Sequence, residues 1–149
     1  MPEQDKIFIS TDRSLLDMNI IYQFLSGSYW AKGRPREIVK KSVDNSLCFG
    51  VYNERKQIGF ARVVTDFATF AWIADVFILE EYRGKGYSKK LLQTILGFPT
   101  LQDMKRWILA TKDAHELYRK FGFQPLNKPE HFMEILTLKK DTPDKRKNA

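Results

Sequence analysis

Residues 74–92 read Ala-Asp-Val-Phe-Ile-Leu-Glu-Glu-Tyr-Arg-Gly-Lys-Gly-Tyr-Ser-Lys-Lys-Leu-Leu. An apolar run comes first, a turn with glycines and cations follows, and an amphipathic segment ends the stretch. This order predicts a β-strand, a loop and the start of an α-helix. We expect the remaining elements of the chain to pack around this unit.

The loop of this unit has the chemistry of an anion-binding site, and we call residues 84–89 the cradle. Gly84 and Gly86 let backbone N–H groups approach a ligand with no Cβ in the way. The first N–H groups of the following helix lack intrahelical partners and suit a phosphate. Nearby cations favour a ligand with several phosphates; they are Arg83, Lys85, Lys89 and Lys90. A solvated basic turn without a ligand is the alternative, and a Gly-x-Gly pair alone does not decide between the two.

The spacing within this loop resembles a family signature. Arg-Gly-Lys-Gly-Tyr-Ser at residues 83–88 resembles the Arg/Gln-x-x-Gly-x-Gly/Ala motif of the GNAT superfamily of N-acetyltransferases, which also follows a strand. Ser88 departs from the usual Gly or Ala, and its small side chain predicts only a minor adjustment of the loop. The stretch is neither a P-loop nor a dinucleotide-binding fingerprint, because the glycine spacing of both is missing.

A second stretch, about thirty residues further on, also resembles this family. Residues 114–123 read Ala-His-Glu-Leu-Tyr-Arg-Lys-Phe-Gly-Phe and are similar to the family's Asn-x-x-Ala-x-x-Leu-Tyr-x-x-x-Gly-Phe segment. Thr111 stands where the family usually has an Asn that bonds to the cofactor. The resemblance spans residues 47–138, and two motifs in the right order are more specific than either alone.

Apolar patterning and the resemblance together predict an α/β fold with a GNAT-like central sheet. We expect a mixed, mostly antiparallel sheet of six to seven strands flanked by about four helices, in the order β-α-α-β-β-β-α-β-α-β. The expected strands are residues 7–10, 47–52, 57–65, 70–79, 106–110 and 132–138, with one more short strand near 123–126. The expected helices are residues 14–24, capped by Thr11 or Asp12, then 36–43, the segment after the cradle, and 113–121.

Composition predicts one core without a disulfide or a membrane span. The chain has 149 residues, of which 43% are hydrophobic, and this is enough for a single core. Cys48 is the single cysteine, which excludes an intrachain disulfide. No apolar run reaches the roughly 18–20 residues of a membrane helix, and the polar first residues lack a signal peptide. We therefore expect a cytoplasmic protein with no membrane partner.

The net charge of +7 comes partly from the end of the chain, since residues 139–149 carry five cations and two acids. We expect residues 1–140 to form a single GNAT domain and residues 141–149 to form a basic flexible tail. A nucleic-acid partner is not expected, because the chain has no basic stripe with interleaved aromatic residues.

The resemblance implies acetyl-CoA as the acetyl donor. The backbone of Val76, Phe77 and Ile78 is implied to bind the pantetheine and acetyl arm almost as an added strand, with one N–H as an oxyanion hole. The pyrophosphate is implied to bind the loop residues Arg83, Gly84, Lys85, Gly86, Tyr87, Ser88 and Lys89. No metal is expected, because the two histidines and the cysteine lack metal-ligand spacing.

Two residues are candidates for proton transfer. By resemblance, Tyr118 is the general acid that protonates the departing thiolate, and a phenol with a pKa of ~10 is protonated at neutral pH. Packing on a helix face is the alternative role of Tyr118. Asp75 interrupts an apolar run, where an unpaired carboxylate would be costly. We expect it either to hold or deprotonate the incoming amine, or to form a salt bridge with a cation such as Arg62.

Together these residues predict an N-acetyltransferase that moves an acetyl group from acetyl-CoA to a primary amine by direct transfer in a ternary complex. No acyl-enzyme is expected at Cys48, which has no activating motif. The alternative is a CoA-binding sensor or regulatory module without turnover, although such a module would not need Tyr118. Tyr29 and Trp30 are candidates for lining the acceptor pocket, with packing as their other role. The acceptor, a small-molecule or peptide amine, and the choice between monomer and homodimer stay open.

Overall fold

The computed structural model describes residues 4–137 of the chain. The chain divides into two compact units, Met1–His115 and Glu116–Ala149. The first unit holds the sheet and three helices, and the second holds most of α4 (His115–Arg119) and the segment that follows it. In the described part of the chain, no helix is both long enough and apolar enough to cross a membrane. The tail predicted for residues 141–149 lies outside the described residues.

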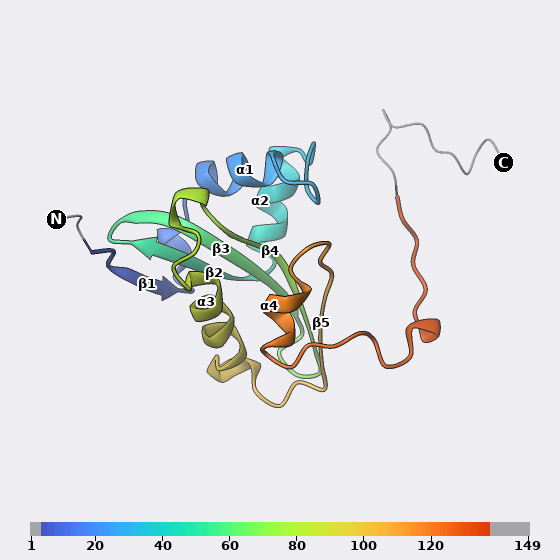
Figure 1. Ribbon diagram of the computed structural model, residues 1–149. Coiled ribbons are helices and arrows are strands. Elements are labelled where there is room, and N and C mark those ends of the chain that lie inside the picture. The colour runs from blue at the N-terminus through green and yellow to red at the C-terminus, as the bar shows by residue number, and fades with distance from the viewer. Residues whose placement is uncertain (1–3, 138–149) are drawn as a thin grey trace. The chain divides into compact units, whose positions relative to one another are not determined.

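One mixed sheet of five strands forms the centre of the first unit (Figure 1). Its strands, in spatial order, are β1 (Ile7–Ser10), β2 (Leu47–Asn53), β3 (Lys56–Thr65), β4 (Phe70–Ile78) and β5 (Arg106–Leu109). Neighbouring strands from β1 to β4 are antiparallel, whereas β4 and β5 are parallel. The prediction of a mixed, mostly antiparallel sheet is therefore confirmed.

Helices cover both faces of this sheet. They are α1 (Met18–Ser26) and α2 (Arg36–Asp44) on one face and α3 (Tyr87–Leu96) on the other (Figure 1). On the α1 face, Phe77 of β4 stacks on Phe24 with ring centroids 4.0 Å apart. Full burial of a phenylalanine side chain contributes roughly 1.5–3 kcal/mol, so this stack fixes the end of β4 beneath α1. On the α3 face, Phe49 meets Phe98 edge-on at 5.1 Å.

The first predicted helix, residues 14–24, is interrupted in the structure. Arg13–Leu15 form a short 3₁₀ turn, and α1 begins only at Met18. The break occurs because the Asp17 carboxylate accepts the N–H groups of Asn19 and Ile20, which makes Asp17 the N-cap of α1. Asp12, one of the two predicted caps, instead caps the 3₁₀ turn.

The prediction of six to seven strands is wrong, because five are present in the described residues. Residues 132–137 form no strand, and the side chains of Met133 and Ile135 are 97% and 93% exposed. Residues 123–126 form no strand either, and Leu138 lies outside the described part of the chain. Apolar alternation indicates a strand, but a strand also needs a hydrogen-bonded neighbour, and none of the described strands pairs with these residues.

The helix predicted over residues 113–121 is shorter in the structure, where α4 covers His115–Arg119. The N–H groups of Phe121 and Gly122 each bond to a carbonyl three residues earlier, so tight turns replace the last helical residues. Gly122 has φ of +95°, which suits the left-handed conformation that commonly ends helices.

Candidate active site

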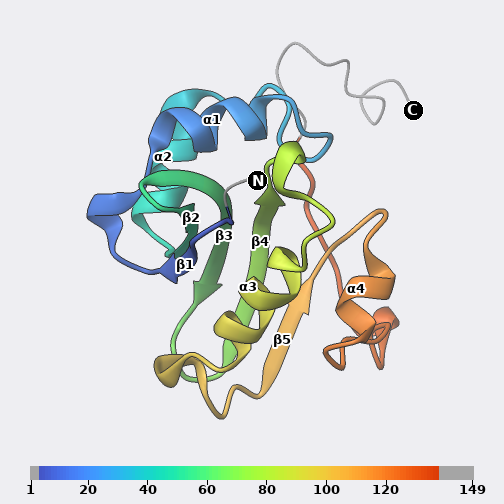
Figure 2. The same ribbon diagram turned by 60° about the vertical axis from the view of Figure 1, so that its left-hand side comes forward.

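β4 and β5 pair over only part of β4. Their parallel register runs from Phe70 opposite Arg106 to Ile73 opposite Leu109. β4 then continues to Ile78, beyond the tip of β5 (Figure 2). Among residues 4–137, no strand pairs with this edge of β4 after Ile73. The edge includes Val76, Phe77 and Ile78, so it could accept an extended ligand as an added strand.

A β-bulge lies at the start of this edge. Phe60 pairs with Phe77, and Arg62 pairs with Ala74, so Asp75 and Val76 together face a single residue of β3. Asp75 has φ of +54°, the left-handed conformation that Asp tolerates better than most residues. Bulges bend a strand and redirect its side chains, and they are common beside active sites. Here the bulge turns the Asp75 carboxylate toward the α1 and α2 face.

The cradle follows β4 after a short 3₁₀ turn and opens directly into α3. Gly84 and Gly86 have φ of +79° and +83°, and a Cβ added at either would meet no atom within 4 Å. The need for glycine is therefore conformational, and the space above the loop is open. Gly86 is the N-cap of α3 and provides no side-chain cap, and the first turn of α3 has no acidic residue. This helix start is suited to an anion, as the sequence predicts.

The cations of the loop have separate partners. Arg83 donates from Nε to the carbonyl oxygen of Ile78 at 3.0 Å, and its guanidinium lies 5.9 Å from the centre of the Phe24 ring. Arg83 therefore ties the loop to the end of β4 and to α1. Lys85 and Tyr87 both bond to the Asp5 carboxylate, at 2.8 and 2.7 Å.

The contact with Asp5 shifts two pKa values. The hydrogen bond from Lys85, followed by that from Tyr87, lowers the pKa of Asp5 below its ordinary value. The same carboxylate raises the pKa of the Tyr87 phenol to about 12 through their hydrogen bond.

Ser88 is half-buried and Lys89 is exposed in the first turn of α3. The cradle thus keeps an exposed cation at the helix start.

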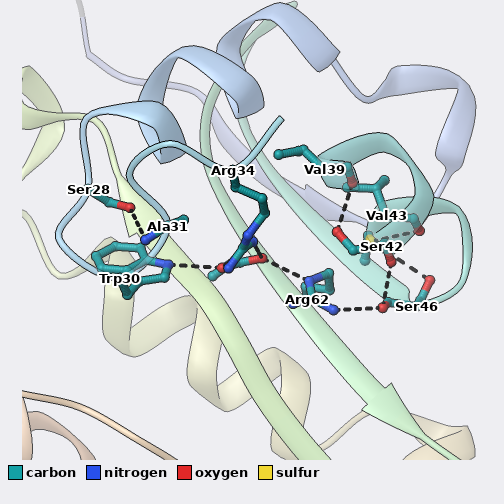
Figure 3. A network of polar contacts seen from close by, with 11 residues as sticks. Ser28, Trp30, Ala31, Arg34, Val39, Ser42, Val43, Ser46 and Arg62 are labelled. Atoms are coloured by element: carbon teal, nitrogen blue, oxygen red, sulfur yellow. Dashed lines mark hydrogen bonds and ion pairs between the residues drawn. The ribbon is translucent and has the colours of Figure 1, made fainter. Parts of the chain in front are cut away.

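Asp75 is the centre of a buried network of polar contacts, and it is only 6% exposed. Trp30 donates its indole N–H to one oxygen at 2.9 Å, and Arg62 donates from Nε to the other at 2.8 Å. Arg34 adds Nη1 at 3.1 Å from the second oxygen. Figure 3 shows Trp30, Arg34 and Arg62 converging on this point from different segments. The predicted salt bridge between Asp75 and Arg62 is confirmed.

The loop between α1 and α2 contacts both strands at the place where the pairing of β4 with β5 ends. Trp30 bonds to Asp75 on β4, while the Tyr29 hydroxyl accepts the backbone N–H of Lys112, just after β5, at 3.1 Å. The Tyr29 and Trp30 rings meet edge-on with centroids 5.1 Å apart, and the two residues are 54% and 39% exposed. Both aromatic residues therefore stand at the unpaired edge of β4 with part of each ring open to solvent.

Two further candidates lie in different surroundings. The Cys48 thiol is buried and lies 3.4 Å from the Val43 carbonyl oxygen, and its burial raises its pKa to about 11. A protonated, buried thiol is a poor nucleophile.

In the second unit, Tyr118 is 8% exposed and packs edge-on against Phe123 with ring centroids 5.9 Å apart. The role of Tyr118 as general acid stays a prediction.

Sequence reasoning predicted the strand, loop and helix that contain the cradle, but it missed the contacts of Arg34 and Asp5. Both residues are distant in sequence from the residues that they contact. Arg34 is 41 positions from Asp75, and Asp5 is 80 positions from Lys85. The one available signal was the isolated acid within an apolar strand, which requires a cationic partner but does not identify it.

Comparison with known proteins agrees with this geometry. The family model of the acetyltransferase (GNAT) domain matches residues 44–125, which is more than half of the chain and includes both β4 and the cradle. The chain belongs to the GNAT acetyltransferase family. Members of this family use acetyl-CoA. This GNAT chain has the unpaired edge of β4 and the cradle in consecutive segments.

Individual relatives support the same family. A crystal structure from Xanthomonas campestris pv. campestris, described as "a putative acetyltransferase belonging to the GNAT family", is 46% identical, with a TM-score of 0.86 over 92% of this chain and 95% of that one. A Gibberella zeae protein named "Putative acetyltransferase FG08082" is 31% identical over 75% of each chain. An Elizabethkingia anophelis GNAT structure with acetyl-CoA bound shares the fold, with a TM-score of 0.64 at 19% identity over 83% of this chain and 80% of that one.

Proposed function

We propose that this GNAT protein transfers the acetyl group of acetyl-CoA to a primary amine by direct transfer in a ternary complex. The observation that carries the proposal is the continuity of two binding features. The unpaired edge of β4 from Ala74 to Ile78 leads within a few residues into the glycine cradle and the open N-terminus of α3. A ligand with an extended amide-bearing arm and a pyrophosphate fits this order.

The strand edge would hold the acetyl arm. Backbone groups of Val76, Phe77 and Ile78 would pair with the amides of the pantetheine arm, as a neighbouring strand does. The bulge at Asp75 and Val76 changes the direction of the backbone there, so one N–H can point at the thioester carbonyl rather than along the ladder. Such a donor stabilises the oxyanion that forms when the amine attacks.

The cradle would hold the pyrophosphate. Backbone N–H groups from Gly84 to Lys89 and the start of α3 supply donors, and Lys89 supplies exposed positive charge. Lys85 and Tyr87 can contribute to the same site by exchanging their shared partner Asp5 for a phosphate oxygen. Arg83 would act indirectly, because its Nε is bonded to the end of β4.

Proton transfer completes the reaction. The amine nitrogen attacks the thioester carbon, the carbon–sulfur bond breaks, and the thiolate takes a proton that we assign to Tyr118. The amine loses its proton to water, and the Tyr118 phenolate regains one proton from water, so the protons balance over one turnover. Asp75 has both oxygens engaged with Trp30, Arg34 and Arg62, so we assign it a positioning role in place of general base. Cys48 stays outside the reaction, because its thiol is buried and protonated.

The test is thiol release from acetyl-CoA against a panel of primary amines, with the acetylated product identified by mass. Transfer to one amine class, with one thiol released for each acetyl group transferred, supports the proposal. Tight acetyl-CoA binding without transfer to any amine contradicts it and favours a CoA-binding sensor. Absence of binding contradicts the assignment of the cradle as well.

A further inference from the structure

Resting on the proposed acetyl transfer, we infer that the acceptor amine also carries a carboxylate, and that Arg34 binds this carboxylate. The acceptor class is then an amino acid or a peptide with its carboxylate near the reacting amine. A polyamine, which carries several positive charges and no carboxylate, is then not expected to be the acceptor. Three features of the network around Asp75 carry the inference.

The first feature is a surplus of positive charge. Arg34 and Arg62 share the single carboxylate of Asp75, at 3.1 and 2.8 Å. Arg13 adds a third guanidinium close by, which donates to the carbonyl oxygens of Val43 and Ser46. Ser46 also accepts from Arg62 through its hydroxyl, at 3.2 Å, so these groups form one cluster.

Asp44 and Asp75, the two acids that act on the Cys48 thiol together with Arg13 and Arg62, do not cancel this charge. Asp44 at the end of α2 is paired with Lys40 at 2.7 Å, and Asp75 is already shared between two guanidinium groups. An acceptor with several cations would be repelled from such a cluster, whereas an acceptor with an anionic group would be attracted. The charge therefore favours an anionic acceptor over a polyamine.

The second feature is the unused side of the Arg34 guanidinium. Arg34 contacts Asp75 through Nη1 alone, at 3.4 and 3.1 Å from the two oxygens. Among residues 4–137, its Nε and Nη2 make no hydrogen bond, and its side chain is 25% exposed against 14% for Arg62. Asp75 thus fixes the guanidinium in place, and its planar fork keeps donors that match the two oxygens of a carboxylate.

The third feature is the position of Arg34. Its partner Asp75 belongs to the bulge, directly before Val76 on the unpaired edge of β4. The same carboxylate accepts a hydrogen bond from Trp30, a residue that is 39% exposed and whose ring meets that of Tyr29 edge-on. An acceptor carboxylate on Arg34 would therefore bring its amine toward the thioester, and the two rings would offer an apolar wall to its side chain.

The experiment compares matched acceptors that differ in one group. Acetylation of L-phenylalanine and of L-phenylalaninamide is measured as kcat/KM at fixed acetyl-CoA, with spermidine as the polycationic acceptor. Wild type is expected to favour the carboxylate over the amide by about tenfold or more, the range for a charge-assisted hydrogen bond. Preference for the amide or for spermidine, with acetyl-CoA turnover intact, overturns the inference and leaves the proposed function standing.

Variants separate recognition from reactivity, because the amine of the amide is intrinsically easier to deprotonate. Arg34→Gln should lower the carboxylate-to-amide ratio by about tenfold and leave the KM for acetyl-CoA unchanged. Lys105→Gln is the control, since it removes one exposed positive charge beside β5 at the opposite end of the β4–β5 pairing. Arg34→Lys keeps the positive charge but loses the planar pair of donors of the guanidinium group. It replaces Arg34→Gln as the test variant if Arg34→Gln does not fold. An unchanged ratio in a folded Arg34 variant overturns the inference.

Direct binding keeps the inference testable if no amine is acetylated, an outcome that would defeat the proposed function. The probes are N-acetyl-L-phenylalanine and N-acetyl-L-phenylalaninamide, titrated by calorimetry into protein saturated with CoA. About tenfold tighter binding of the carboxylate, lost in the Arg34 variant, supports a carboxylate site. Equal binding of the two probes, or no binding of either, overturns it.

Discussion

Trp30 and Asp75 are joined by a hydrogen bond of 2.9 Å between the indole N–H and the carboxylate, although 45 positions separate them in the chain. The bond fixes the loop between α1 and α2 to the bulge of β4, and the two ion pairs of Asp75 strengthen the same junction. The acceptor side of the proposed site is therefore attached to the strand that would hold the acetyl arm.

Asp75→Asn should lower the free energy of unfolding by roughly 2–4 kcal/mol, because two poorly exposed guanidinium groups lose their shared counter-charge. Urea denaturation of variant and wild type measures the change. Lys40→Gln breaks an exposed pair and should cost less than about 1 kcal/mol. Unchanged stability of Asp75→Asn, with a raised KM for the acceptor, would instead show that Asp75 binds the amine.

Gly86→Ala should weaken acetyl-CoA binding by about tenfold or more, because alanine is strained at a φ of +83° and the loop would change shape. Gly86→Asn should retain more affinity, since asparagine tolerates this conformation. Calorimetry gives both dissociation constants. Gly27→Ala is the control at an ordinary φ of −96°. Equal affinity in all three variants would show that the cradle conformation is not needed for binding.

Tyr118→Phe should reduce kcat by about 10²-fold or more and leave acetyl-CoA affinity unchanged, because it removes only the proposed proton donor. Steady-state kinetics and calorimetry on the same preparation separate the two effects. Tyr22→Phe on α1 makes the same chemical change outside the proposed machinery and should retain the wild-type rate. A wild-type rate in Tyr118→Phe refutes the general acid.

The stabilising contribution of the Cys48 thiol should depend on pH. Burial raises its pKa to about 11, above the value of 9.0 expected in the unfolded chain, so the folded state retains the proton between these values. The contribution is complete below pH ~9 and is lost as the pH rises toward ~11, by up to about 2 kcal/mol. The difference in unfolding free energy between wild type and Cys48→Ala, measured across this range, should shrink accordingly. A constant difference contradicts the pKa shift.

The parts of the site that are local in sequence could be predicted, and the others could not. The strand, glycine loop and helix of residues 74–92 form as expected, because each signal depends on neighbouring residues. The Arg34 contact with Asp75 depends on how a loop packs across the sheet, which periodicity does not describe. The strand expected at residues 132–138 was also mispredicted because strand formation depends on distant residues. Apolar and polar residues alternate there, but none of the described strands pairs with this segment.

Hydrogen exchange in the presence and absence of acetyl-CoA tests the central assignment most directly. Saturating acetyl-CoA should slow exchange in two segments, the unpaired edge of β4 at residues 74–78 and the cradle at residues 84–89. The β3–β4 turn around Phe67, at the other end of β4, should exchange as before. Tight binding without protection of either segment would contradict the account, because the ligand would then lie elsewhere on the protein.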